Sequence, residues 1–167
     1  NVTNMSYMFG DATQFNQPIG NWNTEKVTNM GGMFYRATAF NGDISGWNIE
    51  QVTNMGDMFL EAIAFNQPIG NWKTYVVTDM GGMFYEANAF NGDISGWYTQ
   101  QVTSMNSMFF GATTFDQEIG SWDVLAVVDM SGMFYEANAF NGDISGWNIQ
   151  QVTSMNSMFF GATTFDQ

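Results

Sequence analysis

The residues in this sequence that could do chemistry are mainly carboxylates. The chain carries 16 Asp and Glu residues, and it has no His and no Cys. It therefore lacks the commonest general base and the thiolate and imidazole metal ligands. No glycine-rich motif for binding phosphate occurs either. A glycosidase-like pair of carboxylates is formally possible, but we expect the protein not to be an enzyme.

Four of these carboxylates are spaced so that they could bind a hard cation. If the chain stacks at the period described below, they fall on adjacent layers: Asp93, Asp116, Glu118 and Asp143. Calcium takes oxygen ligands at about 2.4 Å, so this group predicts a Ca²⁺ site. The alternative, which we favour, is a solvated acidic edge with no bound ion. No other cofactor is implied.

The charge and hydropathy of the chain narrow the choice of partner. Only three residues are Lys or Arg, and the net charge is −13. Neutralising phosphate groups requires basic side chains, so the composition argues against nucleic acid and against an anionic membrane surface. No apolar run approaches the length of a membrane span. The expected partners are a protein or a glycan, or a second copy of the chain through the repeat ends.

A period of 25 residues organises the entire chain. Six full copies carry the pattern V-T-x-M-x-x-M-F-x-x-A-x-x-F-[ND]-x-x-I-x-x-W or a close variant, and a seventh carries it as far as Gln167. We call each copy a rung. The rungs begin at Val2, Val27, Val52, Val77, Val102, Val127 and Val152. One rung is too small to fold alone, so the rungs must stack and cover each other. We expect residues 1–167 to form one solenoid that is part of a longer array.

The spacing within a rung predicts a short helix followed by a short strand. Met30, Met33, Phe34 and Ala37 fall at i, i+3, i+4 and i+7, which is one face of a helix. The residue before the first Met is Asn, Asp or Ser in every rung, and these residues favour the N-cap. The segment from Trp47 to Ile49 predicts a strand. The expected fold class is therefore α/β, with a short parallel strand and a short helix in each rung.

The I-x-x-W-x-[TIV] segment resembles the L-x-x-L-x-L core of leucine-rich repeats. The whole repeat is similar to the Mycoplasma-type bacterial-surface-protein repeat of the BspA-like leucine-rich-repeat family. This resemblance implies a right-handed curved solenoid, an extracellular or cell-surface location, and a role in adhesion. It implies no catalytic residues.

The resemblance also places one variable column of residues on the concave face, where a partner would bind. The column contains Asn23, Asn48, Lys73, Tyr98, Asp123 and Asn148. Variation on a fixed scaffold is typical of a specificity-determining surface, and drift on an unconstrained surface is the alternative. Two other columns are expected to be structural. The column of Asn16 should bond turn backbone, and the column of Tyr35 should pack between rungs.

The rungs also alternate in pairs. Odd rungs carry Q-P-I-G-N-W or Q-E-I-G-S-W, whereas even rungs carry G-D-I-S-G-W. Duplication of a 50-residue unit or a partner that contacts every second rung would explain this. The function that we expect is a non-enzymatic scaffold for protein or glycan interaction and adhesion. The alternative is a structural element of a fibre built from stacked repeats, with Ca²⁺ as a stabilising ion.

Overall fold

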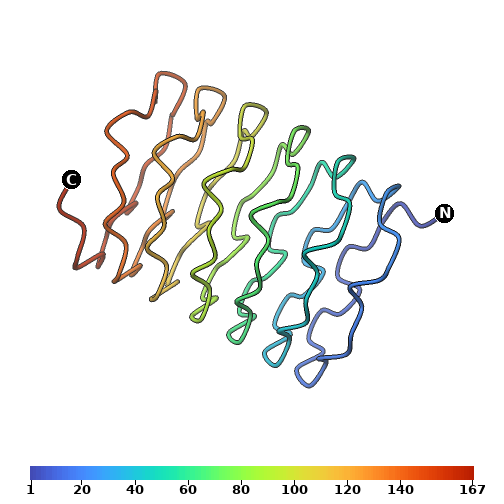
Figure 1. Cartoon of the computed structure of the whole chain (residues 1–167). Helices are drawn as coiled ribbons and strands as arrows, with labels where there is room; N and C mark the ends of the chain where they lie inside the picture. The colour runs from blue at the N-terminus through green and yellow to red at the C-terminus, as the bar shows by residue number, and fades with distance from the viewer.

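The computed structural model describes the whole chain, residues 1–167, as a stack of coils, one for each rung (Figure 1). The chain enters the stack at one end and leaves it at the other, so the termini lie far apart. Residues one period apart lie side by side: the Thr28 N–H donates to the Thr3 carbonyl at 2.7 Å, and the Thr53 N–H donates to the Thr28 carbonyl at 2.8 Å. The 25-residue period of the sequence is thus the register of the stack.

The predicted α/β architecture is wrong, because the structure contains no helix and no extended strand. The only strand-like pairing is a set of isolated parallel bridges, each one residue long. These bridges join Asn4, Asn29, Asn54, Asp79, Ser104, Asp129 and Ser154 in turn. No helix of the structure is therefore long and apolar enough to cross a membrane.

A series of tight turns replaces the predicted helix. The Met33 N–H donates to the Met30 carbonyl at 3.1 Å, and the Tyr35 N–H donates to the Gly32 carbonyl at 3.0 Å. Gly32 has a φ of 61° and Arg36 a φ of 54°, so both are left-handed. A right-handed helix cannot include such residues, whereas a type II turn requires one at its third position.

The N–H groups that alternate with those of the turns donate to backbone carbonyls of the next rung. Met30 donates to the Asn54 carbonyl at 3.0 Å, and Phe34 donates to the Met58 carbonyl at 2.9 Å. Gly32 and Arg36 do the same, and equivalent bonds recur along the stack. We call this side of the stack the turn wall. Its backbone groups are satisfied partly within the rung and partly by the neighbouring rung.

The predicted strand at Trp47–Ile49 is also wrong, because side chains rather than backbone connect the rungs there. The Trp47 indole Nε1 donates to the Ile19 carbonyl at 3.1 Å. The Thr24 hydroxyl donates to the Asn48 carbonyl at 2.8 Å. Trp47 and Thr24 are both buried, so their polar atoms need partners. The rung turns at this point instead of extending, since the Trp47 N–H bonds the Ile44 carbonyl.

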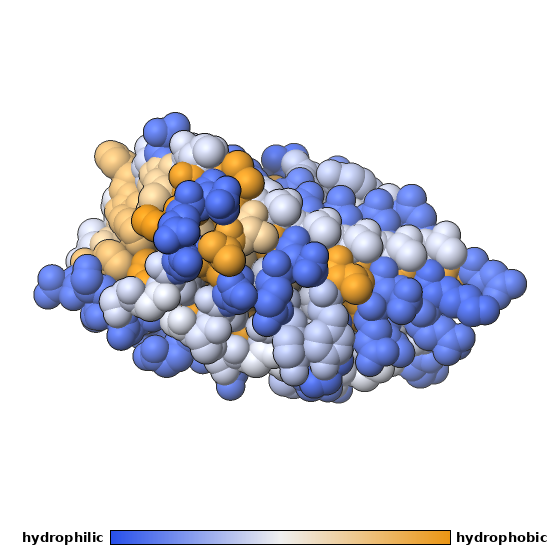
Figure 2. Space-filling view, turned by 90° about the horizontal axis from the view of Figure 1, so that it is seen from above, coloured by the Kyte–Doolittle hydropathy of each residue, from blue (hydrophilic) through white to orange (hydrophobic).

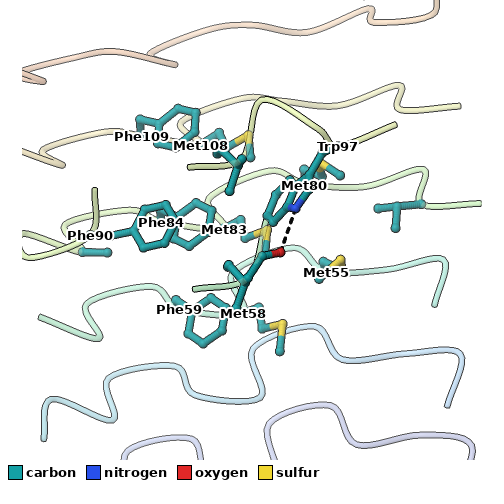
Figure 3. Packing of buried hydrophobic residues seen from close by; sticks show 14 of the residues in the cluster. Met55, Met58, Phe59, Met80, Met83, Phe84, Phe90, Trp97, Met108 and Phe109 are labelled. Carbon is teal, nitrogen blue, oxygen red and sulfur yellow. Dashed lines mark hydrogen bonds between the residues drawn. The ribbon is translucent and has the colours of Figure 1, made fainter. Parts of the chain in front are cut away.

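One continuous hydrophobic core runs along the axis of the stack. The predicted inward residues Met30, Met33, Phe34 and Ala37 are all fully buried. Phe34 stacks on Phe40 of its own rung at 3.8 Å and lies 5.6 Å from Phe59 of the next. Figure 3 shows the equivalent packing in the middle rungs, including the hydrogen bond from Trp97 to the Ile69 carbonyl. Each rung therefore buries its apolar side chains against both neighbours.

A ladder of side-chain amides and carboxylates confirms the structural role predicted for the Asn16 column. The Asn41 N–H donates to Asn16 Oδ1 at 3.0 Å, and the Asn66 N–H donates to Asn41 Oδ1 at 2.9 Å. Asp116 serves equally well, because its Oδ1 accepts from the Asn141 N–H at 2.9 Å. Each side chain thus satisfies a backbone group of the next rung.

The alternation of odd and even rungs has a packing cause within the chain. A Cβ on Gly70 of rung 3 would overlap the carbonyl oxygen of Asp93 in rung 4, so only glycine fits. In the other direction, Gln67 Nε2 of rung 3 donates to Asn41 Oδ1 of rung 2 at 2.9 Å. The same contacts recur two rungs later, at Gly120 and Gln117. Successive interfaces along the stack are therefore of two kinds.

Candidate interaction surface

All six residues of the predicted variable column are exposed. Each follows a tryptophan that is buried or partly buried, and in rungs 1 to 5 it precedes a buried residue. In rung 2, for example, Asn48 lies between buried Trp47 and buried Ile49. The side chain at this position must therefore point to solvent in every rung. The prediction that the column is accessible to a partner agrees with this geometry, but binding itself stays a prediction.

Four of the six residues in this column have a local structural role. The Asn48 Oδ1 accepts the Glu50 N–H at 3.0 Å, which closes the turn after the tryptophan. Asn23, Asp123 and Asn148 make the same bond two residues on, at 3.0–3.2 Å. Short amides and carboxylates commonly close turns in this way. Their recurrence is therefore explained without a partner.

Lys73 and Tyr98 are the two members of the column that cannot make this bond, and the structure brings them together. The ring centroids of Tyr98 and Tyr75 are 4.2 Å apart. Lys73 Nζ lies 6.0 Å from the centroid of the Tyr98 ring. A hydrogen bond with the Tyr98 hydroxyl raises the pKa of Tyr75, and burial and nearby charge act in the same direction. We call Lys73, Tyr75 and Tyr98 the aromatic cluster.

The aromatic cluster is exposed although its residues are large. Tyr75 is 45% exposed and Tyr98 is 37% exposed. Its backbone is nonetheless fixed, because the buried Thr74 hydroxyl donates to the Tyr98 carbonyl at 2.8 Å and accepts from the Tyr98 N–H at 2.8 Å. The cluster therefore presents two aromatic rings and one cation on a rigid support.

Further apolar side chains are exposed on the same loop in rungs 3 and 5. Val76 is 39% exposed and Leu125 is 44% exposed. In the other full rungs these loop positions hold Glu, Lys or Gln. In the view of Figure 2, hydrophobic residues gather separately toward the C-terminal rungs, to which exposed Ile149, Met155 and Phe160 belong, and the remaining surface is mainly hydrophilic. Variation in the sequence thus coincides with unusual exposure of apolar surface.

The four predicted cation ligands do not form one cluster. No group of three or more acidic side chains is arranged to hold a metal ion. Asp93 Oδ1 accepts from the Ser95 N–H at 2.9 Å, and Asp116 belongs to the ladder described above. Glu118 and Asp143 line the same surface depression, whereas Asp93 lines another. The Ca²⁺ site stays a prediction with little geometric support.

The column of Tyr35 packs between rungs, as predicted. Phe110 stacks between Tyr85 at 4.4 Å and Tyr135 at 4.3 Å, with nearly parallel rings. Their faces cover one another, and all three side chains are half-buried. Burial, together with the charges of nearby glutamates, raises the pKa of Tyr85. This column stabilises the stack rather than offering ring faces to a ligand.

Residues 1–95 and 65–167 each match a family profile described as Mycoplasma protein of unknown function, DUF285. The two matches together cover the entire chain and overlap, as expected for a repeated sequence. No curated protein and no solved structure matches the chain. The chain belongs to the DUF285 family.

Proposed function

We propose that this member of the DUF285 family is a non-catalytic scaffold that binds a protein partner through the aromatic cluster. The observation that carries the proposal is the replacement of turn-closing amides by Lys73 and Tyr98 beside exposed Tyr75. Tyrosine is enriched at the energetic centres of protein interfaces, because it buries a large area with few rotatable bonds. The rigid backbone beneath the cluster lowers the entropic cost of binding.

The charge of the chain favours a partner with a basic surface. With a net charge of −13, the protein attracts cationic partners over long range and repels acidic ones. Lys73 adds a single positive charge at the aromatic cluster, whereas the chain as a whole is acidic. An extracellular or cell-surface location and a role in adhesion are part of the proposal. They are supported by the resemblance of the repeat sequence to BspA-like surface repeats, and labelling of intact cells with an antibody would test the location.

The binding test is to restore the regular rung sequence at the aromatic cluster. The double variant Lys73→Asn/Tyr98→Asn places the residue of rungs 1, 2 and 6 in rungs 3 and 4, so the turn-closing bond should form and the fold should persist. We expect the wild-type chain to bind members of an array of immobilised basic extracellular proteins, and the double variant to bind at least tenfold more weakly. Asn48→Asp is the matched control, since it keeps its turn bond and should bind as the wild type. Equal binding by all three proteins would exclude the proposal.

A second candidate is end-to-end association, favoured by the complementary faces of the first and last rungs. The N–H groups of Met155, Ser157 and Phe159 have no backbone acceptor, and the carbonyls of Asn4 and Ser6 have no backbone donor. Further rungs of a longer chain would satisfy the same groups. Sedimentation of the 167-residue chain over a range of concentrations distinguishes the two candidates. Filaments would support association, and monomers at every concentration would exclude it.

A further inference from the structure

Three depressions on the surface recur at intervals of two rungs. They lie between rungs 1 and 2, rungs 3 and 4, and rungs 5 and 6, with volumes of about 530, 470 and 380 Å³. Each forms at the interface where a glycine of the odd rung lies against an aspartate carbonyl of the even rung. The glycines are Gly20, Gly70 and Gly120. The depressions are therefore a product of the two-rung packing described above.

The side chains that line the depressions are rich in hydrogen-bonding groups. Every depression contains the aspartate of its even rung and a short polar residue that follows the odd-rung glycine. The aspartates are Asp43, Asp93 and Asp143, and the short polar residues are Asn21, Asn71 and Ser121. Asn71 Nδ2 donates to the Ser45 carbonyl at 3.1 Å, which fixes the amide and leaves its oxygen available as an acceptor.

The aspartates are held ionised and oriented. The Oδ1 atom of Asp93 accepts the Ser95 N–H at 2.9 Å, and the Oδ1 atom of Asp143 accepts the Ser145 N–H at 2.8 Å. Hydrogen bonds from the hydroxyl and N–H of Ser95 lower the pKa of Asp93, so the carboxylate is charged at neutral pH. Each of the three carboxylates is exposed to solvent and has acceptor capacity left for a hydrogen bond from a ligand.

This chemistry excludes several classes of ligand. No Lys or Arg lines the three depressions, which disfavours phosphate, sulfate and other anions. Pro18 and Pro68 are the only apolar side chains that line them, so an apolar ligand would gain little. Two of the three contain a single carboxylate, which is too few for a tightly bound cation. Carboxylate, amide and hydroxyl groups on an open surface instead match a ligand that carries many neutral hydroxyl groups.

We propose that the row of depressions binds a neutral oligosaccharide along the stack, with one contact point in every second rung. The row is separate from the aromatic cluster, so this goes beyond the protein partner proposed above. In the tryptophan column beside the depressions, the ring centroids of Trp72, Trp97 and Trp122 are 6.4 Å apart from one rung to the next, which places neighbouring depressions, two rungs apart, about 13 Å from each other. A polymer with its own regular repeat can occupy several such points at once, and each added contact raises the overall affinity.

The experiment is a titration of the 167-residue chain with neutral oligomers of glucose, mannose, galactose and N-acetylglucosamine, from two to eight units long. We expect at least one series to bind, with an affinity that rises with length. The triple variant Asp43→Asn/Asp93→Asn/Asp143→Asn should bind at least tenfold more weakly. It should stay folded, because an asparagine Oδ1 can accept the same serine N–H, with a small loss of stability because the ionised aspartates favour the folded state. Heparin should not bind, since the surface lacks basic groups.

A second triple variant provides an independent check. Asn21→Ala/Asn71→Ala/Ser121→Ala removes the other shared polar group from each depression, and a comparable loss of affinity is expected. Tyr98→Asn lies outside the row and should bind saccharide as the wild type does, which separates this proposal from the protein-binding one. The proposal is overturned if no neutral oligosaccharide binds, or if both triple variants bind as tightly as the wild type.

Discussion

At the scale of single residues, glycines decide how closely two rungs approach. Gly70→Ala should destabilise the protein by about 2 kcal/mol or more, because the new Cβ would overlap the rigid Asp93 carbonyl oxygen. Gly96→Ala is the matched control. A Cβ there lies 3.7 Å from the Gly70 carbonyl oxygen, an ordinary contact, so the change should stay within about 0.5 kcal/mol. Chemical denaturation of both variants makes the comparison, and equal stabilities would contradict the two-rung packing.

Asp57 gives a pH-dependent prediction at the same scale. Burial, and to a lesser extent the charge of Asp79, raises the pKa of Asp57. The folded protein therefore holds this proton more tightly than the unfolded chain, and ionised Asp57 destabilises the fold above that pKa. Asp57→Asn should raise stability at pH 7 by about 0.5 kcal/mol, a figure discounted because the side chain is partly solvated.

The gain from Asp57→Asn should shrink as the pH falls through the raised pKa, and it should vanish near pH 3, where Asp57 is protonated in both states. Thermal melts of the wild type and the variant from pH 3 to pH 8 measure this. Asp43→Asn serves as the comparison. The pKa of Asp43 is lowered, chiefly by the Ser45 N–H, so its ionised form is the one favoured in the folded state. A gain that is constant with pH would show that the charge of Asp57 is not responsible.

At the scale of elements, the side-chain ladder of the Asn16 column can be tested with the chain's own variation. Asn66→Ala removes the acceptor for the Asn91 N–H, which lies 3.0 Å away, and should cost about 1 kcal/mol. Asn66→Asp keeps an acceptor, as Asp116 does for Asn141, and should be nearly neutral. Urea denaturation measures both. If the alanine variant is as stable as the aspartate variant, the ladder does not contribute to stability.

The elements also show how much of the fold could be predicted from the sequence. The spacing of Met30, Met33, Phe34 and Ala37 correctly predicts which side chains face the core, because that spacing reports an inward face. It does not report the backbone path. A series of turns with left-handed residues at Gly32 and Arg36 brings the same four side chains inward. In the sequence, only the Gly31-Gly32 pair indicated turns of this kind, and the same pair is also compatible with a helix of low stability.

The candidate site was predictable in part for similar reasons. A position that follows an inward tryptophan must face solvent, so the accessibility of Lys73 and Tyr98 followed from the pattern. Their association with Tyr75 did not, because it depends on how far a side chain of rung 3 reaches toward rung 4. The three depressions were also missed. They arise where the Gly70 backbone approaches the Asp93 carbonyl, and the composition of the chain carries no sign of that approach.

At the scale of the whole molecule, stability depends on the position of a rung in the stack. Met83→Asp places an unpaired charge in the fully buried core of rung 4 and should cost about 4 kcal/mol or more. Met8→Asp is the equivalent change in rung 1, where the side chain is 52% exposed, and it should disturb only that end. Hydrogen exchange followed along the chain tests this. Similar loss of protection in the middle rungs of both variants would contradict the dependence on neighbouring rungs.

The peptide dipoles of the turn wall are aligned with the axis of the stack. The peptide group between Asn29 and Met30 points its carbonyl at rung 1 and its N–H at rung 3, and its counterparts in the wall of the other inner rungs point the same way. In an ordinary sheet such group dipoles alternate and largely cancel. Here those of the wall add along the axis, as they do in a helix. The turn wall therefore carries a dipole with its positive pole toward rung 7, and the N–H groups of the Thr28 column, which point toward rung 1, offset part of it.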